Sequence, residues 1–449
     1  MGDLNELDFQ DSSSFDHGFQ VMEFGDLRGI LQYVPQFRGR TFVIALDGAV
    51  VAAENFSNIL LDLAVLRSLN VRIVLVHGAA HQIKELASKR GVKLSNADGI
   101  GATDDETLEI GLDAITRLGS DMMRDLTALK IRAVTANVIT AHPAGIVKGE
   151  EQGHSGKMDR IDHEMLEGFL DKEILPVVPP LGYDGSGRTL RMNSDQIAME
   201  IAVVLKASKI IFVTADEPDI GLDPHSARQL SAEQGADLLD QAGWNKVSTN
   251  LRSKLKQAVR ACQEGVSRVH LINGSRDDAL LAELFSNEGV GTMIFADDYQ
   301  RIRNAVPADV EEMLLMMYRA MEDEQLAERD KSEILAHLED YVVMEIDGNV
   351  VGAGALHSYE SEGVAELACI YVKKDHEGQG YGQTLVNLLE ERAKQLGVNR
   401  LFALSTQATE YFITKFSYRE SADLEEMPAE RRVKWEENGR NARYLVKDI

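Results

Sequence analysis

Residues 364–386 of the 449-residue chain read VAELACIYVKKDHEGQGYGQTLV and contain the pattern that decides how the second half folds. The apolar run over 364–372 predicts a buried strand, and the apolar spacing that follows predicts a helix over 383–396. Three glycines stand between them, Gly378, Gly380 and Gly382. Because glycine has no Cβ, the backbone N–H groups of such a turn can approach a ligand closely, and the next helix adds N-terminal donors. The turn is a candidate pyrophosphate site, and the alternative is a tight turn that only caps the helix.

The segments on either side of this stretch predict a mixed α+β domain. A helix is expected over 310–321, followed by apolar strands at 341–346 and 350–356. The turn between these strands, Asp347-Gly348-Asn349, is typical of a hairpin. A further strand is expected at 400–404, after the helix.

The first half of the chain has a different pattern, in which short apolar strands alternate with helices. A helix is predicted over 55–69, where apolar residues recur at helical spacing. The expected strands are 41–46, 72–76, 175–178, 209–214 and 268–272. This alternation predicts a mainly parallel sheet covered by helices on both faces, an αβα sandwich. The fold class is therefore α/β, with the α+β domain at the C-terminal end.

Composition excludes several classes of partner. Lys and Arg number 47 and Asp and Glu 73, which gives a net charge of −26 and argues against a nucleic-acid or anionic membrane partner. The first 26 residues hold seven acidic residues and no Lys or Arg, unlike a secretory or transit peptide. No apolar run approaches the roughly 20 residues that span a bilayer. We expect a cytoplasmic protein with an acidic, disordered tail at 1–25.

The two cysteines, Cys262 and Cys369, lie far apart in the chain. They form no CxxC motif and no cluster with histidine, so we expect neither a disulfide scaffold nor a metal site. Cys369 fits a small apolar filler better than a nucleophile, since no His or Asp partner stands out to activate it.

The strand, the EGQGYG turn and the helix, between a hairpin and the strand LFALST, resemble the GNAT family of acetyl-CoA-dependent N-acetyltransferases. In that family the turn binds the pyrophosphate of coenzyme A through a Gln/Arg-x-x-Gly-x-Gly/Ala motif. Glu377 stands at the Gln/Arg position, whereas Gly380 and Gly382 match. The resemblance implies a set of acetyl-CoA-binding residues, which are Ile370, Tyr371, Val372, Gly378, Gln379, Gly380, Tyr381 and Gly382.

Acetyl transfer to an amine needs a proton acceptor, a donor for the thioester oxygen and a proton for the departing thiolate. Glu366, inside the apolar strand, is a candidate general base, and the alternative is a carboxylate with a structural partner. The backbone N–H groups of Cys369 or Ile370 can bind the oxyanion. Ser405 and Tyr411 are both candidates to protonate the thiolate.

The whole chain resembles the bacterial-type N-acetylglutamate synthase family, in which an amino-acid-kinase-like domain precedes a GNAT domain. Matching stretches include HSGKMDRID (154–162), ELACIYV (366–372), RLFALST (400–406) and NGRNARYLV (438–446). The resemblance implies transfer of acetyl from acetyl-CoA to L-glutamate, the first step of arginine biosynthesis. It implies an amino-acid-kinase-like regulatory domain at 26–296 and a GNAT domain at 300–449. Within the second, Glu366 matches the general base and Ser405 the proton donor.

The same resemblance implies that Arg329, Arg440 and Asn441 bind glutamate. Two guanidinium groups suit a dicarboxylate substrate, since each binds a carboxylate bidentately. The alternative for either arginine is a solvated surface charge. Ala442 stands where the family often has Ser, which removes one hydrogen bond to the substrate.

Residues 41–294 resemble N-acetylglutamate kinase, with losses at the positions that handle phosphate. The lysine of that enzyme's first strand corresponds to Ala45, its first glycine to Asp47, and an arginine that holds substrate to Gly101. Its His-Gly-Gly-Gly loop is His77-Gly78-Ala79-Ala80 here. Three kinase positions are retained, Asn193, Asp195 and Lys254. The losses predict no phosphoryl transfer and no use of ATP.

Arginine-sensitive members of the family carry an N-terminal helix, which corresponds to residues 26–37. The matching effector residues for L-arginine are Tyr33, His270, Glu283, Gly289 and Gly291. The alternative is that Tyr33 and His270 serve packing only. The resemblance also implies a homo-oligomer, commonly a hexamer.

Three other functions are open to the sequence. One is a kinase active on N-acetylglutamate, which Ala45 argues against. Another is a non-catalytic arginine sensor, which the presence of Glu366 and Ser405 argues against. The last is an acetyltransferase for a different amino acid, which Ala442 makes worth testing.

Overall fold

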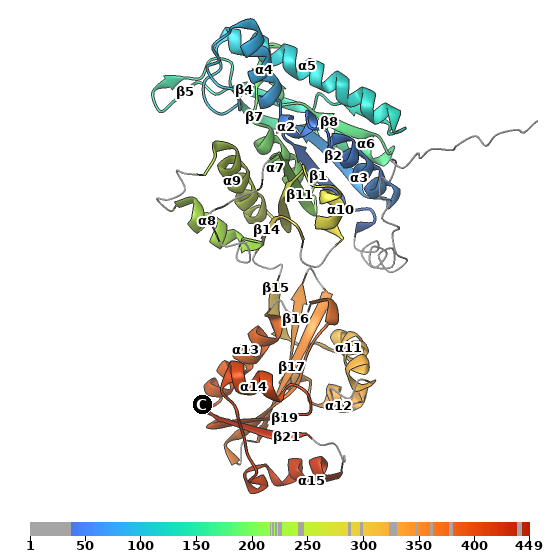
Figure 1. The fold of residues 1–449 in the computed structure, drawn as a ribbon, viewed down its shortest axis with the longest axis vertical. Helices are drawn as coiled ribbons and strands as arrows, with labels where there is room; N and C mark the ends of the chain where they lie inside the picture. The colour runs from blue at the N-terminus through green and yellow to red at the C-terminus, as the bar shows by residue number, and fades with distance from the viewer. Residues whose placement is uncertain are drawn as a thin grey trace, which may run out of the picture.

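The computed structural model describes residues 37–215, 217, 220, 222, 227–240, 247–285, 289–296, 300–322, 330–346, 349–359, 362–376, 380–437 and 442–449. The acidic tail, the expected helix at 26–37 apart from Phe37, and the hairpin turn at 347–348 lie outside the described residues. Figure 1 shows two lobes, the first ending with β14 (Thr292–Phe295) and the second beginning with β15 (Gln300–Asn304). No helix in the described ranges combines the length and apolar character that a membrane crossing requires.

The first lobe is built on an eight-stranded sheet in the order β12-β14-β13-β11-β1-β2-β8-β3. Its strands are β1 (Thr41–Leu46), β2 (Arg72–His77), β3 (Ala133–Thr135), β8 (Leu175–Val178), β11 (Lys209–Thr214), β12 (Gln229–Ser231), β13 (Arg268–Asn273) and β14. Every neighbouring pair is parallel except β13 with β14. The expected mainly parallel sheet is confirmed.

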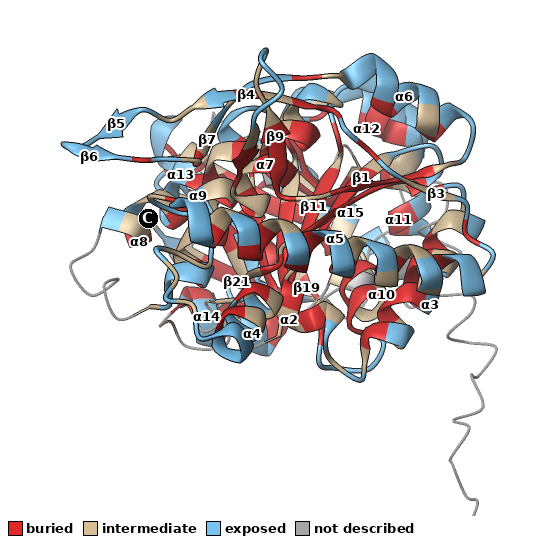
Figure 2. Ribbon diagram, turned by 90° about the horizontal axis from the view of Figure 1, so that it is seen from above, coloured by how far each residue is buried: buried red, intermediate tan, exposed pale blue. Residues whose placement is uncertain are grey.

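Helices cover both faces of this sheet and form two cores. The first core packs against α6 (His163–Asp171), α7 (Ser194–Val204), α8 (Ala232–Asp240) and α9 (Thr249–Gln263). The second packs against α3 (Phe56–Ser68), α4 (Ala80–Arg90), α5 (Asp105–Ala128) and α10 (Ala279–Leu284). β1 supplies alternate residues to each core, which explains why its sequence is continuously apolar. Figure 2 shows buried residues along the central strands and exposed residues on the outer helix faces.

Three small elements beside the main sheet were not expected. A four-stranded sheet has the order β10-β9-β4-β7, with β4 at Ile139–Pro143, β7 at Gly156–Ile161, β9 at Leu181–Tyr183 and β10 at Thr189–Arg191. A two-stranded ribbon joins β5 (Ile146–Val147) to β6 (Glu150–Glu151). After β1 the backbone enters a short helix, α2 (Gly48–Val51).

The second lobe contains a seven-stranded sheet in the order β15-β16-β17-β18-β19-β21-β20. The strands after β15 are β16 (Tyr341–Ile346), β17 (Asn349–Tyr359), β18 (Val364–Val372), β19 (Arg400–Ser405), β20 (Arg419–Glu420) and β21 (Arg443–Asp448). Only β18 and β19 pair in parallel. This mixed sheet confirms the expected α+β architecture.

Helices also cover both faces of the second sheet. α13 (Tyr381–Gln395) packs on one face, together with α14 (Thr409–Phe416). On the opposite face lie α11 (Val310–Glu322) and α12 (Lys331–Ala336). α15 (Ala429–Glu437) precedes β21, and its Trp435 packs against a small core around Phe402 and Tyr444. The predicted helices at 310–321 and 383–396 correspond to α11 and α13.

Candidate active site

The two parallel strands at the centre of the second sheet separate before they end. β18 and β19 are paired from Val364 and Arg400 as far as Leu367 and Ala403. β18 then continues to Val372 and β19 to Ser405 without further pairing between them, although both segments lie within the described residues. The predicted oxyanion and cofactor residues of β18 and the predicted proton donor of β19 therefore lie where the two strands part.

β18 is also irregular at this point. Its pairing with β17 shifts register between Ala353 and Ala355, opposite residues 368–371. Cys369 has φ of +54°, in the left-handed region that a residue with a Cβ seldom adopts. A bulge of this kind turns backbone groups away from the regular ladder, and such strain is common at functional sites. The irregularity falls on Cys369 and Ile370, the two residues predicted to bind the oxyanion.

Glu366 is buried, with 2% of its surface exposed, and is paired with an arginine that the sequence did not reveal. Arg431 on α15 donates from Nε to Oε2 at 2.6 Å and from Nη2 to Oε1 at 2.8 Å. A bidentate contact of this kind is strong and fixes the carboxylate plane. Glu366 thus has the structural partner of the alternative prediction, and its role as a general base stays a prediction.

Arg431 was missed because 65 residues separate it from Glu366. The available signal was physical, since a carboxylate inside an apolar strand needs a cation or several donors. That signal says that a partner exists and does not say which arginine it is.

Both candidates for thiolate protonation lie near the point where the strands part. Ser405 is 9% exposed, and its Oγ accepts a hydrogen bond from the Ala408 N–H at 2.9 Å. Because this bond uses a lone pair, the hydroxyl hydrogen of Ser405 remains available for donation. The Tyr411 hydroxyl lies beside Gly382, 3.5 Å from where a Cβ would stand, and burial raises the pKa of Tyr411.

The described part of the Gly-rich turn begins at Gly380, because Gly378 and Gln379 lie outside the described residues. Gly380 has φ of +80° and directly precedes Tyr381, the first residue of α13. The turn thus delivers the chain to a helix N-terminus, where unpaired N–H groups and the helix dipole favour an anion.

The residues predicted to bind glutamate, Arg329, Arg440 and Asn441, also lie outside the described residues. The described residues on either side of Arg440 and Asn441 are close to the site. α15, on the N-terminal side, supplies Arg431 to Glu366, and Arg443, on the C-terminal side, is paired with Ser405 between β21 and β19.

Comparison with known proteins agrees with this geometry. Residues 40–273 match the amino acid kinase family, and residues 308–417 match the acetyltransferase (GNAT) family. An amino-acid acetyltransferase from Aeromonas salmonicida is 31% identical over 93% of this chain and 96% of its own length. The chain belongs to the amino-acid acetyltransferase family. The expected resemblance is confirmed, and the enzyme is an acetyltransferase.

Two solved structures have the same two-domain architecture as this acetyltransferase. N-acetylglutamate synthase from Neisseria gonorrhoeae, complexed with coenzyme A and L-arginine, matches with a TM-score of 0.80 and 27% identity. The match covers 95% of this chain and 99% of that one. The same protein complexed with coenzyme A and N-acetyl-glutamate matches with a TM-score of 0.61 and 30% identity, over the same shares of the two chains.

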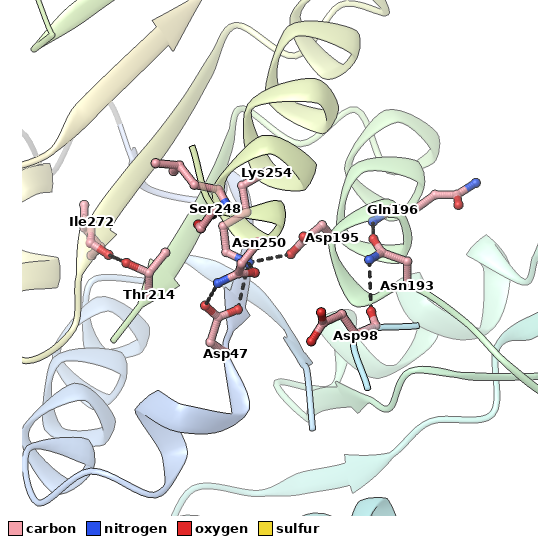
Figure 3. A network of polar contacts seen from close by, with 11 residues as sticks. Asp47, Asp98, Asn193, Asp195, Gln196, Thr214, Ser248, Asn250, Lys254 and Ile272 are labelled. Carbon is pink, nitrogen blue, oxygen red and sulfur yellow. Dashed lines mark hydrogen bonds and ion pairs between the residues drawn. The ribbon is translucent and has the colours of Figure 1, made fainter. Parts of the chain in front are cut away.

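The kinase-like domain of the acetyltransferase contains a buried charge cluster at the ends of its central strands (Figure 3). Lys254 is 1% exposed, and its Nζ donates to Asp47 Oδ1 at 2.7 Å, Asp195 Oδ1 at 2.9 Å and Asn250 Oδ1 at 2.9 Å. Burial alone would lower the pKa of Lys254, but the two carboxylates raise it above its ordinary value. The ammonium group therefore uses its three hydrogens on side chains of its own chain.

Asn193, the third retained kinase position, caps α7 by accepting the Gln196 N–H at 2.9 Å. His77, at the end of β2, is fully buried, and this burial lowers its pKa to about 4. In the part of the chain that the structure describes, no group of three or more His, Cys, Asp or Glu side chains is placed to hold a metal ion.

The predicted effector residues that are described lie together around β13 and α10 of the first lobe. His270 on β13 and Glu283 on α10 are both buried and joined at 2.6 Å between Nδ1 and Oε1. Glu283 Oε2 accepts the N–H groups of Val290 at 2.6 Å and Gly291 at 2.9 Å. Gly289 has φ of +64°, and Tyr33 lies outside the described residues.

The pKa values of both members of this pair are lowered, for different reasons. Burial lowers the pKa of His270, against the effect of its carboxylate partner. Burial alone would raise the pKa of Glu283, but His270 and the two backbone N–H groups lower it overall. Glu283 therefore accepts hydrogen bonds from the 289–291 turn, in addition to its predicted role toward an effector.

Proposed function

We propose that the enzyme is an N-acetylglutamate synthase, which transfers acetyl from acetyl-CoA to the α-amine of L-glutamate. The observation that carries this proposal is the buried Glu366 on a bulged strand that parts from its parallel neighbour opposite Ser405. The neisserial synthase, which matches over most of this chain, has been solved with coenzyme A and N-acetyl-glutamate. This match supports glutamate as the acceptor.

In the proposed mechanism the acetyl group passes directly from sulfur to nitrogen. Glu366 accepts a proton from the substrate ammonium, and the freed amine attacks the thioester carbon. The backbone N–H groups of Cys369 and Ile370 stabilise the oxygen as it gains negative charge. As the C–S bond breaks, Ser405 donates its hydroxyl proton to the thiolate, and the second proton that the nitrogen loses as the amide forms passes through water to restore the Ser405 hydroxyl. The hydrogen bond that Ser405 accepts from Ala408 supports this role, because it holds Oγ in place without using its hydrogen.

Acetyl-CoA is proposed to bind along the separated part of β18 and at the N-terminus of α13. Tyr371 and Val372 lead from the bulge toward the turn, and Gly380 places the chain at the helix start. The glutamate carboxylates are proposed to bind Arg329 and Arg440, with Asn441 beside them. In this arrangement residues 300–449 form the catalytic domain.

Residues 26–296 are proposed to form a regulatory domain that binds L-arginine and does not transfer phosphate. The neisserial synthase with L-arginine supports the first half of this proposal. The contacts of Lys254 support the second, because its three ammonium hydrogens are donated to Asp47, Asp195 and Asn250 and none is left for a phosphoryl oxygen. Oligomerisation, expected as a hexamer, belongs to the same proposal.

The decisive experiment measures release of coenzyme A from acetyl-CoA with a panel of amino acids, with and without L-arginine. We expect glutamate to be the preferred acceptor and arginine to change its turnover. Preference for another amino acid would move the enzyme to a different substrate within the same family. If the protein binds L-arginine but shows no turnover with any amino acid, the result would instead favour a non-catalytic arginine sensor.

A further inference from the structure

A histidine beside Glu366 is held by a hydrogen bond at one ring nitrogen, while its other ring nitrogen has no hydrogen-bond partner within the described residues. His357 on β17 makes a hydrogen bond of 2.7 Å between its Nδ1 and Oδ2 of Asp340, in the short 3-10 turn Leu338–Asp340 before β16. The His357 side chain is 15% exposed. Its Nε2 is buried and, within the described residues, has no hydrogen-bond partner. A buried polar nitrogen without a partner is costly and calls for an explanation.

The position of His357 is fixed by the sheet. β17 and β18 are antiparallel, and His357 is directly paired with Glu366. Residues paired in this way project from the same face of the sheet, with Cβ atoms about 4.5–5.5 Å apart. The imidazole and the candidate base are thus neighbours on the face that carries Arg431.

The contacts of Glu366 show why a neighbouring base matters. Both carboxylate oxygens receive hydrogen bonds from Arg431. A proton that reaches Glu366 must therefore compete with the guanidinium for one of these oxygens, and a second acceptor beside Glu366 can take it onward. His357 offers such an acceptor, because its Nδ1 is hydrogen-bonded to Asp340 and its Nε2 has no hydrogen-bond partner within the described residues.

We propose that His357, oriented by Asp340, receives the amine proton that Glu366 removes from the substrate. This inference rests on the proposed function and adds a proton acceptor to it. The N–H bond of the ammonium breaks as the proton moves to Glu366, and the proton then passes to His357 Nε2, directly or through one water. The C–N bond forms and the C–S bond breaks in the acetyl-transfer step, and His357 later returns its proton to solvent. His357 is therefore a positioning and relay residue that acts through Glu366.

The other titratable and charged groups that face His357 are few among the described residues. The ring of Tyr341 lies 5.7 Å away and the ring of His337 6.2 Å away, between centroids. The charged groups are Asp340, Glu366 and, through Glu366, Arg431. Each of these can influence a pH profile, so the test relies on paired variants as well as on pH.

The test compares His357→Asn with the wild-type enzyme. Asn places its amide nitrogen near the position of Nδ1 and keeps the bond to Asp340, but it has no group at the position of Nε2. We expect kcat with glutamate at pH 7 to fall by about tenfold or more, because the variant lacks a proton-transfer group. The KM values for glutamate and acetyl-CoA should stay within about twofold of wild type. The loss should shrink as pH rises, because free amine then enters without needing a proton acceptor.

Asp340→Asn provides a second variant that keeps the hydrogen bond and removes only the charge. It should lower kcat in the same pH-dependent way, and it carries the test if the His357 variant does not fold. His357→Asn with wild-type kcat at pH 7, or Asp340→Asn with an unchanged pH profile, would overturn the relay. Failure of the proposed function looks different, because the wild-type enzyme itself would then not acetylate glutamate.

Discussion

The two domains each bury a cation against carboxylates, and the two clusters differ in what they leave unused. In the kinase-like domain Lys254 spends its three hydrogens on Asp47, Asp195 and Asn250, all of which belong to the cluster. In the acetyltransferase domain Arg431 donates two hydrogen bonds to one carboxylate, that of Glu366. Nearby are the positive φ of Cys369 and the Nε2 atom of His357, which has no hydrogen-bond partner within the described residues. A closed cluster stabilises a fold, whereas a cluster with open neighbours can also move protons.

Glu366→Gln gives the sharpest test of the open cluster. The amide keeps the volume but accepts no proton, so turnover at pH 7 should fall by about 10²–10⁴. Steady-state kinetics with glutamate and acetyl-CoA measure this, and coenzyme A affinity by calorimetry is the control. Turnover at pH 7 equal to wild type would remove Glu366 as the base.

Lys254→Met gives the matching test of the closed cluster. It leaves the buried Asp195 and the half-buried Asp47 without their cation, which should destabilise the first domain by about 3–5 kcal/mol. Thermal unfolding with and without urea measures the loss. The control is Asp47→Asn/Lys254→Met/Asp195→Asn, which removes all three charges and should recover most of the stability. If the single variant melts like wild type, the cluster contributes little to the fold.

Arg431→Lys changes the open cluster more gently. Lysine keeps the charge but not the bidentate fork, so Glu366 loses its fixed orientation. We expect a fall in kcat of about tenfold, less than for Glu366→Gln. Arg432→Lys, one residue along the same helix, is the matched control and should have no such effect. Equal falls in kcat in the two variants would mean that the loss comes from a general change in α15 and not from the contact between Arg431 and Glu366.

Glu283→Gln should have the smallest effect, confined to regulation. The amide cannot pair with a guanidinium or ammonium group and holds the 289–291 turn less firmly, so we expect a weaker arginine response. Turnover without arginine should stay within about twofold of wild type, since Glu283 lies outside the acetyltransferase domain. A full arginine response would exclude Glu283 from the effector site.

The sequence predicted the fold well where apolar patterns were strong. Strand β1 was identified because its residues face a core on both sides and are continuously apolar. The small sheet was missed because a strand such as β7, GKMDRI, is mostly exposed or half-buried and shows no apolar run. α2 was missed because four residues are too few to display a period.

The candidate site was predicted in part, through motifs that are local in sequence. Glu366, Cys369 and Ser405 could be proposed from two strands and their neighbours. Arg431 and His357 could not, because their roles depend on contacts across α15 and β17 that no local pattern records. Motifs locate candidate reacting groups, and the fold shows which residues from distant segments contact them.

The early end of the β18–β19 pairing links cofactor binding to stability. If acetyl-CoA lies between the two diverging strands, it replaces contacts that a continuous sheet would have made for itself. Ligand that binds only the folded state adds about 2.7 kcal/mol of stability at a hundred times its dissociation constant. Saturation with coenzyme A should therefore raise the melting temperature of the second domain, which offers a way to rank ligands for this enzyme without measuring catalysis.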